Sequence, residues 1–273
     1  MRCPHTDREL IQWEDSPQFL FEPKFKILYN TRWMPSSYNE NYFFEEYQQQ
    51  YGKTYLEDEP HIRKLSQQRL KLLKPHLTFH SSLLELGCAF GFFLDEAKPY
   101  FSTIKGVEIS SFASNYAKQR FGFDIEQKDL LVFLEENDTT FDVIASFYVI
   151  EHFSQQRRLW ELISKTLSEG GLWISAIPSI NGPLFVFHRD FWKKNHPIDH
   201  FVDYHPLSIK RLLEFYGLRL ISLKPASYHQ ERTKGVLKKM PFFLYKLYCD
   251  VFVFSDTMIF IAEKPKKNSH SKS

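Results

Sequence analysis

The sequence predicts an α/β fold in which a doubly wound sheet is covered by helices on both faces. From residue 83 onward, short apolar runs typical of buried strands alternate with stretches whose apolar residues recur at helical spacing. The first of these runs ends at a glycine and turns at once into a helix. Hydrophobic residues make up 43% of the 273 residues, which is enough for an extensive core. Because such alternation requires right-handed crossovers, we expect a parallel sheet.

The N-terminal part precedes this alternation and is expected to form a cap. Residues 1 to about 56 show little periodicity and are rich in Tyr and Phe, so we expect an aromatic, partly helical cap. Residues 57–76 carry a helical stripe of apolar residues, with acids before Pro60 and bases toward the end, as the helix dipole favours. We therefore assign residues 1–75 to the cap and its lead-in helix.

The alternating segments follow in order along residues 76–265, which we assign to the main domain. Strands are predicted at residues 83–86, 104–109, 123–127, 141–147 and 171–177, and helices at 91–100, 112–121 and 155–167. An aromatic, His-rich insertion at 181–206 leads to a helix, "PLSIKRLLEFYG", and a strand, "LRLISLKP". A second insertion at 227–255 precedes the last strand, "TMIFIAEK", and a basic tail at 266–273 that we expect to be disordered.

The composition argues against several classes of protein. Lys and Arg (35) outnumber Asp and Glu (33) by only two, so no nucleic-acid partner is expected. Cys3, Cys88 and Cys249 are too few and too far apart for a disulfide framework. The start "MRCPHTDREL" has Thr6 where a zinc knuckle has its second cysteine, which argues against structural zinc. Because we find neither a signal peptide nor an apolar run of about 20 residues, we expect a cytoplasmic protein.

The stretch "LLELGCAFGFFLDEA" is the candidate ligand-binding turn. In a doubly wound sheet, ligands bind beyond the carboxyl ends of the strands, where the first strand feeds the first helix. Glu85, Gly87, Cys88, Ala89 and Gly91 occupy that place. The two glycines permit tight turning, and the helix N-terminus offers unpaired N–H groups to an anion. The alanine adds one methyl group and is expected to suit a turn with negative φ.

Polar residues end the next strands as well. Glu108 ends "IKGVEIS", where an acid can accept both hydroxyls of a ribose. Asp129 and Leu130 end "IEQKDL", where a polar and an apolar side chain can flank an adenine ring. The strand in "FDVIASFYVIEHF" ends near Phe147 and Tyr148 and leads to Glu151 and His152.

In this order, these stretches resemble the class I S-adenosylmethionine-dependent methyltransferases, and within them the small-molecule branch similar to the ubiquinone-biosynthesis methyltransferases. The likeness rests on "LLELGCAFG", "GVEIS", "QKDL", "FDVIASFYVIEH" and "LSEGGLWISAIP", between residues 83 and 179. It implies a Rossmann-like sheet of seven strands with an antiparallel last strand, and S-adenosylmethionine as cofactor. It also implies methyl transfer to an oxygen, nitrogen or carbon nucleophile of a small or lipid- or sugar-linked acceptor.

The resemblance further implies which residues contact the cofactor. Glu85 would lie under the glycine turn, with Gly87, Ala89 and Gly91 along the methionine moiety and Cys88 beside them. Glu108 would take the ribose with Ile109 next to it, Asp129 and Leu130 would flank the adenine, and Phe147 would close the pocket.

Histidines supply the candidate catalytic residues. His152 and His200 could act as a general base toward an acceptor hydroxyl, because imidazole titrates near neutral pH, and Tyr148 is a neighbour. A structural role for Glu151 and His152, in shaping the loop and starting the helix, is the alternative. The segment "NHPIDHFVDYHP" holds residue types that bind divalent metals, His196, Asp199, His200, Asp203 and His205. Its prolines indicate a loop without fixed ligand geometry, so we expect no metal.

The remaining aromatic residues suggest further surfaces. Tyr42, Tyr47, Tyr51 and Tyr55 could contact the cofactor and acceptor or simply pack the cap onto the sheet. Residues 236–254 mix lysines with Phe and Leu as a membrane-surface helix does, although an acceptor lid or a homodimer face would look alike.

Two other functions remain open on the sequence alone. A methyltransferase-like protein without catalysis could sense the cofactor or act as a scaffold. A nicotinamide-dinucleotide oxidoreductase would share the sheet topology, but its G-x-G-x-x-G motif is not found.

Overall fold

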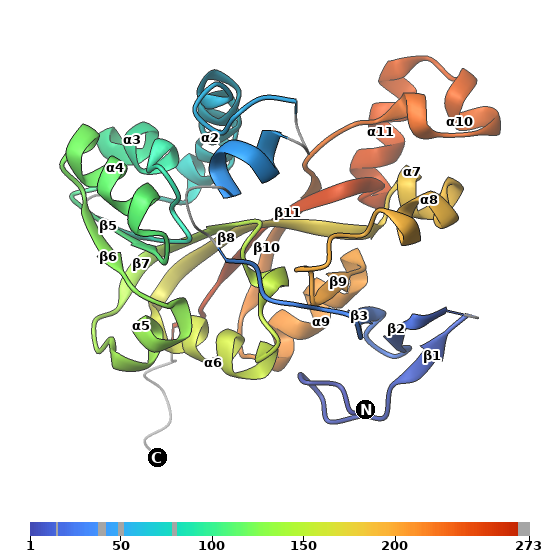
Figure 1. Cartoon of the computed structure of the whole chain (residues 1–273), viewed down its shortest axis with the longest axis horizontal. Coiled ribbons are helices and arrows are strands. Elements are labelled where there is room, and N and C mark those ends of the chain that lie inside the picture. The colour runs from blue at the N-terminus through green and yellow to red at the C-terminus, as the bar shows by residue number, and fades with distance from the viewer. Residues whose placement is uncertain (15, 38–41, 49–51, 78–80, 267–273) are drawn as a thin grey trace. The chain divides into compact units, whose positions relative to one another are not determined.

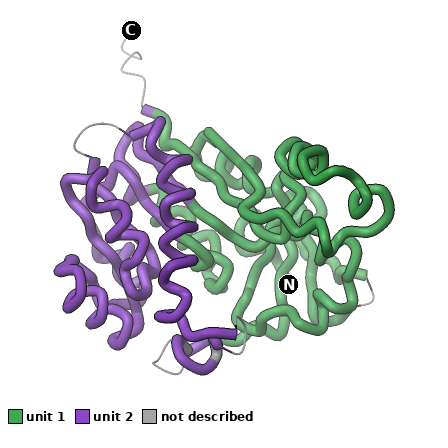
Figure 2. The backbone as a smooth tube through the Cα atoms, turned by 90° about the horizontal axis from the view of Figure 1, so that it is seen from above, with its two compact units in different colours: residues 1–35, 147–164, 175–265 green, residues 36–146, 165–174, 266–273 purple. Residues whose placement is uncertain are grey.

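The computed structural model describes residues 1–14, 16–37, 42–48, 52–77 and 81–266 (Figure 1). The chain divides into two compact units, which are interleaved along the sequence (Figure 2). Unit 1 comprises residues 1–35, 147–164 and 175–265, and unit 2 comprises residues 36–146, 165–174 and 266–273. The basic tail after residue 266 lies outside the described residues.

Unit 2 contains the parallel strands that the sequence predicts. The strands are β4 (Ser82–Leu86), β5 (Thr103–Glu108), β6 (Asp124–Gln127) and β7 (Phe141–Phe147), paired in the order β7-β4-β5-β6. All of these pairs are parallel, and Leu86 lies in register with both Val107 and Ser146. The carboxyl ends of β4, β5 and β7 therefore meet at one edge, which is where a doubly wound sheet binds its ligand.

Helices precede and connect these strands. They are α2 (Glu59–Leu73), α3 (Phe92–Ala97), α4 (Ser111–Phe121) and α5 (Leu130–Glu136), with shorter helical turns η1 (Tyr42–Glu46), η2 (Lys74–His76) and η3 (Lys98–Tyr100). Arg63 of α2 donates to Asp95 and Glu96 at 2.8 and 2.9 Å and so ties α2 to the first crossover helix. The helices α2, α3 and α4 match the predicted segments, whereas α5 was not predicted.

The helix α6 (Gln156–Thr166) and the strand β8 (Leu167–Asn181) each contribute residues to both units. Four further strands, β1 (Ile11–Trp13), β2 (Ser16–Glu22), β3 (Ile27–Asn30) and β9 (Val202–Tyr204), pair antiparallel in that order. Ser179 of β8 pairs in parallel with Tyr204 of β9. The N-terminal cap thus contains three strands up to Asn30, and among its described residues the helical part is η1 and α2.

The rest of unit 1 carries the two insertions and the last strands. The helices are η4 (Ile150–His152), α7 (Pro183–Phe187), α8 (Arg189–Lys194), α9 (Pro206–Phe215), η5 (Gln230–Arg232), α10 (Gly235–Lys239) and α11 (Phe242–Phe252). The strands β10 (Arg219–Pro225) and β11 (Ser255–Glu263) pair antiparallel. The predicted α/β class, with a parallel sheet and an antiparallel last strand, is confirmed.

A buried histidine holds the N-terminus in unit 1. His5 is fully buried, with Nδ1 2.9 Å from the Tyr216 hydroxyl and Nε2 3.2 Å from the Tyr204 hydroxyl. Arg157 donates two hydrogen bonds to the carbonyl of His5. Burial, aided by the Arg157 charge, lowers the pKa of His5 to about 3, so the imidazole is neutral at physiological pH. Nothing in the local sequence signals this role.

Candidate active site

The turn between β4 and α3 is held by three residues in the left-handed region of backbone conformation. Gly87, Ala89 and Gly91 have φ angles of 67°, 44° and 77°. Glycine adopts such angles freely, whereas other residues are strained there. Gly91 also lacks room for a side chain, since a Cβ atom on it would lie 3.1 Å from Cβ of Ala117. The turn therefore depends on glycine at both of its ends.

Backbone hydrogen bonds fix this turn against the end of β5. The N–H groups of Gly87 and Cys88 both donate to the carbonyl of Val107, at 2.9 and 3.1 Å. The N–H of Gly91 donates to the carbonyl of Cys88 at 2.8 Å. The N–H of Ala89 donates to Oε2 of Glu108, also at 2.8 Å. The turn and the acid predicted to take a ribose thus form one unit.

Ala89 corrects one expectation from the sequence. A negative φ was expected for alanine at this position, but its φ is +44°. The hydrogen bond from its amide to Glu108 and the left-handed glycines on either side fix this conformation. An L-residue pays about 1–2 kcal/mol for left-handed geometry.

Replacing Ala89 with glycine is expected to raise the free energy of unfolding by about 1 kcal/mol. Glycine removes the strain of the left-handed residue, and its larger backbone entropy in the unfolded chain offsets part of that gain. Urea unfolding of the variant beside the wild type measures the difference. Ala117→Gly in the middle of α4 is the control and should instead destabilise by at least about 1 kcal/mol. An Ala89→Gly variant less stable than the wild type would show that Ala89 is not strained.

Glu108 is placed to accept hydrogen bonds from a ligand. Its side chain is only 6% exposed, and Oε1 accepts from the N–H of Ser110 at 2.8 Å while Oε2 accepts from Ala89. Burial raises the pKa of this carboxyl, and the backbone N–H groups of Ser110, Ala89 and Ile109 oppose the rise. A carboxylate accepts about four hydrogen bonds. These three backbone groups therefore leave capacity for a hydroxyl of a ribose.

Glu85 and Cys88 lie beneath the turn, as the resemblance implies for Glu85. Glu85 is 4% exposed, and its Oε2 accepts no hydrogen bond from any described residue. Burial raises the pKa of Glu85 well above the usual carboxyl range, the Arg69 charge opposes the rise, and the Glu108 charge adds to it. Cys88 is also buried and packs over Gly106, where an added Cβ would lie 2.7 Å from the sulfur. Cys88 therefore contributes backbone hydrogen bonds to the turn, while its thiol packs in the core.

Asp129 and Leu130 begin α5 and do not end a strand. Oδ1 of Asp129 accepts from the N–H groups of Leu131 and Val132 at 2.9 and 3.1 Å, so this carboxylate caps the helix. Leu130 is 6% exposed, whereas Ile109, next to Glu108, is 51% exposed. Ile109 thus presents more apolar surface than Leu130 does.

The other predicted residues lie in unit 1. Phe147 ends β7 and is half-buried, and it follows Ser146, which is in register with Leu86 of β4. Tyr148 has a φ of 59° and is 39% exposed, and its N–H donates to the carbonyl of Ala176 at 2.8 Å. A tyrosine held in this conformation at a strand end is the kind of strained residue that often marks a functional site.

His152 is oriented by an acid. Its Nδ1 lies 3.1 Å from the carbonyl oxygen and 3.2 Å from Oδ2 of Asp199, and its ring meets that of His200 edge-on at 4.8 Å. Burial alone would lower the pKa of His152, but the hydrogen bond to Asp199 and the Glu151 charge outweigh it and raise the pKa above the usual value. Burial and the charge of His152 lower the pKa of His200 to about 3. The structure thus brings both predicted histidines together and makes them differ in basicity.

Buried polar atoms surround this pair. Neither carboxylate oxygen of the fully buried Glu151 has a hydrogen-bond partner among the described residues, and burial raises its pKa to about 7. Donor atoms of Glu151, His152 and His200 lie within 4.8 Å of one another, as do those of His196, His200 and Asp203. The four ligands of a tetrahedral zinc ion are about 3.3 Å apart. Both groups thus bring metal-binding residue types within a few ångströms of one another.

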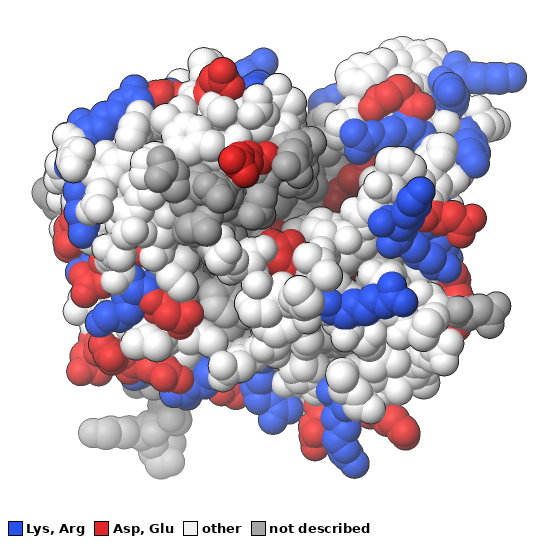
Figure 3. Space-filling view, viewed as in Figure 1, with Lys and Arg blue, Asp and Glu red and all other residues white. Residues whose placement is uncertain are grey.

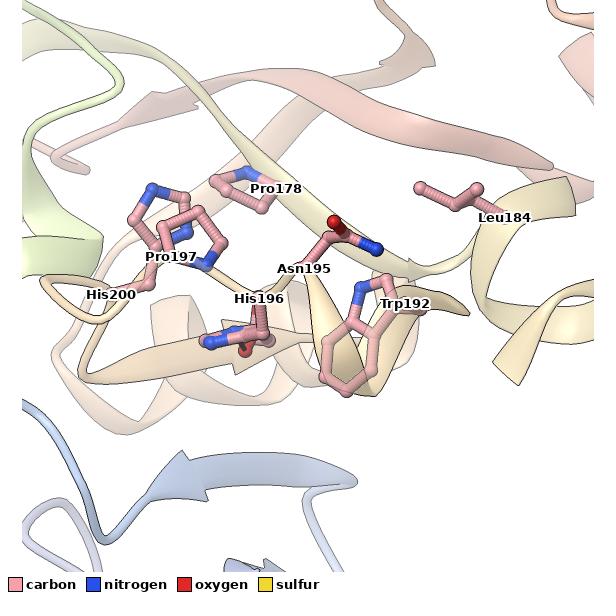
Figure 4. Close-up of a pocket in the computed structure, with 8 residues that line it drawn as sticks. Pro178, Leu184, Trp192, Asn195, His196, Pro197 and His200 are labelled. Carbon is pink, nitrogen blue, oxygen red and sulfur yellow. Dashed lines mark hydrogen bonds and ion pairs between the residues drawn. The ribbon is translucent and has the colours of Figure 1, made fainter. Parts of the chain in front are cut away.

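A pocket of about 120 Å³ adjoins these histidines (Figure 4). Figure 4 shows Pro178 of β8 and Leu184 of α7 along one side, with Trp192 and His196 facing them. The lining is completed by Asn195, Pro197, His200 and Asp203. His196 and Asp203 are hydrogen-bonded at 2.8 Å, and Nδ1 of His196 has no partner among the described residues. The pocket therefore combines apolar walls with polar groups that can still bind a ligand.

Several residues predicted to lie in functional sites have structural roles instead, and two residues of the pocket were not predicted. The side chain of His205 accepts from the N–H of Leu207 at 3.1 Å and so caps α9. Tyr47 donates to Asp58, and Tyr55 packs against Phe43 and Phe90, which supports the packing role of the cap tyrosines. Tyr51 and the side chain of Tyr42 lie outside the described residues. Trp192 and Asn195 were not predicted, although both are close to His196 in the sequence, because nothing in the local pattern shows that they line a pocket with Pro178 and Leu184.

This chain matches known proteins in its sequence family and in its fold. A family model described as "Methyltransferase domain" matches residues 55–223, more than half of the chain, and includes the glycine turn, Glu108, His152 and His200. No curated protein matches this sequence.

Solved methyltransferases share the fold. A SAM-dependent methyltransferase from Archaeoglobus fulgidus is 21% identical, with a TM-score of 0.58 over 77% of this chain and 99% of its own. The N-methyltransferase NodS from Bradyrhizobium japonicum, in complex with S-adenosyl-l-homocysteine, is 19% identical, with a TM-score of 0.52 over 78% and 91%. The magnesium protoporphyrin IX methyltransferase from Synechocystis, with bound SAH, is 13% identical, with a TM-score of 0.53 over 82% and 96%. At these identities the likeness shows the fold alone.

Proposed function

We propose that this chain, which belongs to the class I S-adenosylmethionine-dependent methyltransferase family, methylates an oxygen, nitrogen or carbon nucleophile of a small or lipid- or sugar-linked acceptor. The observation that supports a working cofactor site is the hydrogen bond from the left-handed Ala89 to Glu108, which joins the glycine turn to the acid at the end of β5. The fold alone would not require this bond.

The residues of unit 2 fit the cofactor. Gly87 and Gly91 keep the turn free of side chains, so that a ligand can approach the backbone closely. The Glu108 carboxylate has hydrogen-bonding capacity for a ribose, and the exposed Ile109 beside it offers apolar surface to an adenine. Phe147 of unit 1 is the last residue of β7 and directly follows Ser146, which is in register with Leu86. We assign these residues to cofactor binding.

Methyl transfer requires the protein mainly to position the acceptor against the cofactor. S-adenosylmethionine, when bound, supplies an electrophilic methyl group together with its own leaving group. The protein must align the acceptor and exclude water, and it needs no nucleophile of its own. The exposed, conformationally fixed Tyr148 is suited to contact the acceptor.

His152 is the best candidate for a base if the acceptor is a hydroxyl or an ammonium group. Asp199 fixes the orientation of its ring and would stabilise the imidazolium that forms when it takes a proton. His200, with a pKa of about 3, is too weak a base at neutral pH and is better suited to donate or accept a hydrogen bond. The pocket between Trp192 and Pro178 provides apolar walls near these histidines for the acceptor.

Calorimetric titration with S-adenosylmethionine and with S-adenosylhomocysteine tests the cofactor site. We expect micromolar binding by the wild type and none by Gly87→Arg, because an arginine side chain would fill the turn and strain its left-handed backbone. Gly217→Arg is the matched control, since Gly217 has a φ of 72° and open space around it. Binding that is absent in the wild type, or retained in Gly87→Arg, would contradict this function.

A further inference from the structure

Helix α11 presents an apolar face to solvent. Its inner side is formed by Tyr245 and Cys249, both fully buried and packed with Phe254. The outer side should be polar in a surface helix. Instead, side chains between 42% and 69% exposed lie there and at the helix ends, namely Phe242, Phe243, Leu244, Leu247, Val251 and Phe252.

The helical spacing shows that this exposure is organised. Phe243, Leu247 and Val251 follow one another at intervals of four residues, so they form one row along the helix. Tyr245 and Cys249 are offset from this row by two residues and therefore point the opposite way. Val236 of the preceding α10 adds a side chain that is 77% exposed. A continuous exposed apolar surface of this kind marks a site of interaction.

Lysines surround this apolar surface. Lys234, Lys238, Lys239 and Lys246 are all exposed, and Asp250 is the only acid between residues 234 and 252. Asp250 pairs with Lys246 at 2.7 Å, whereas the structure gives Lys234, Lys238 and Lys239 no ion pair with any described residue. Figure 3 shows the lobe that α10 and α11 form as a mostly white surface with several blue side chains and a smaller red area. The face is therefore both apolar and positively charged.

We propose that α10 and α11 dock onto the surface of an anionic lipid bilayer. Apolar side chains on such a helix enter the boundary between headgroups and acyl chains, while lysines reach the negatively charged headgroups. A second copy of the chain is the poorer occupant, because a symmetric interface would bring the same unpaired lysines together. Within the described parts of the chain, no helix is long and apolar enough to cross a bilayer, so the contact lies on the surface.

Co-sedimentation with vesicles tests this docking in the absence of S-adenosylmethionine, so its outcome is separate from that of the proposed methyl transfer. The purified chain is expected to sediment with vesicles of phosphatidylcholine and phosphatidylglycerol, and about tenfold less with phosphatidylcholine alone. Added salt should weaken the binding, because it screens the lysines. A wild type that sediments with neither kind of vesicle, or equally with both, would overturn the proposal.

Variants locate the contact. Combined Phe243→Ser, Leu247→Ser and Val251→Ser replacements should lower vesicle binding at least about tenfold, and Lys238→Glu with Lys239→Glu should remove the preference for anionic lipid. Leu207→Ser with Phe215→Ser, at positions of α9 that are 46% and 52% exposed, is the control and should bind like the wild type.

The oligomeric state decides between a membrane and a second copy. Because the replaced side chains are exposed, the variants are expected to fold, and circular dichroism verifies this. If sedimentation velocity shows a wild-type dimer that the triple serine variant dissociates, and no vesicle binding is found, the face is a dimer interface and the proposal is wrong.

Discussion

Replacing Glu108 with alanine is expected to lower the affinity for S-adenosylmethionine by about 100-fold or more. The change removes the carboxylate that we assign to the ribose, and it also releases the N–H groups of Ala89 and Ser110. A charge-assisted hydrogen bond contributes about 1.5–3 kcal/mol, so the loss of the bond to the ribose, together with the loosening of the turn that Glu108 holds, reaches this magnitude. Calorimetric titration of the variant and the wild type measures the difference.

Two further variants distinguish a binding effect from a general loss of structure. Glu126→Ala removes an acid from the neighbouring β6, where the carboxylate faces Lys105 at 3.6 Å, and should leave the affinity within about twofold. Glu108→Gln keeps one carbonyl oxygen but turns an amide group toward a backbone N–H, and should give an intermediate affinity. Thermal unfolding of each apo-protein confirms that it is folded. Wild-type affinity in Glu108→Ala would remove this residue from the cofactor site.

Replacing His152 with alanine is expected to lower kcat about 100-fold while cofactor affinity changes by less than about twofold. General bases typically contribute factors of about 10²–10⁴, and His152 is not among the residues that we assign to the cofactor. Methyl transfer to an acceptor found by screening gives kcat, and calorimetry gives the affinity. His229→Ala is the control, because the His229 side chain pairs with the exposed Glu231 and has no part in the proposed site.

The pH dependence of the same reaction tests the role of Asp199. His152 must be neutral to accept a proton, so kcat/KM should rise with pH through its pKa, which lies above the usual 6.5. Asp199→Asn removes the negative charge beside Nδ1 and should move the midpoint of this rise to lower pH. A profile whose midpoint is the same in both proteins would show that His152 is not the group that titrates.

Local sequence patterns were sufficient to predict the strands of unit 2 and the position of the turn between β4 and α3. The strands β4 and β7 are mostly apolar, β5 ends in the buried residues Val107 and Glu108, and glycine marks the turn after β4, so the order of these strands and the position of Glu108 follow from the sequence. The conformation of Ala89 does not, because its φ depends on a hydrogen bond to a residue nineteen positions away. An alanine in the sequence says nothing about that partner.

In unit 1, the strands and the pocket that the sequence did not predict depend on pairing between distant parts of the chain. Residues Val202–Tyr204 are flanked by prolines and were expected to be a loop, but they pair with β3 and form β9. In the same way, β2 lacks a strict alternation of buried and exposed residues, and its strand character comes from its neighbours. The pocket beside His200 needs Trp192 and Pro178 together, which are brought close only when these strands have paired.

The pairing of Ile27 with Tyr204 has a consequence during synthesis. The ribosome makes Ile27 177 residues before Tyr204, and at typical elongation rates this interval takes roughly 10–35 s. Throughout that interval β3 has one edge without the strand that covers it in the finished protein, and such an edge invites pairing with other chains. Two nascent chains that both expose β3 can therefore pair with each other. The yield of native protein should fall as the concentration of these nascent chains rises.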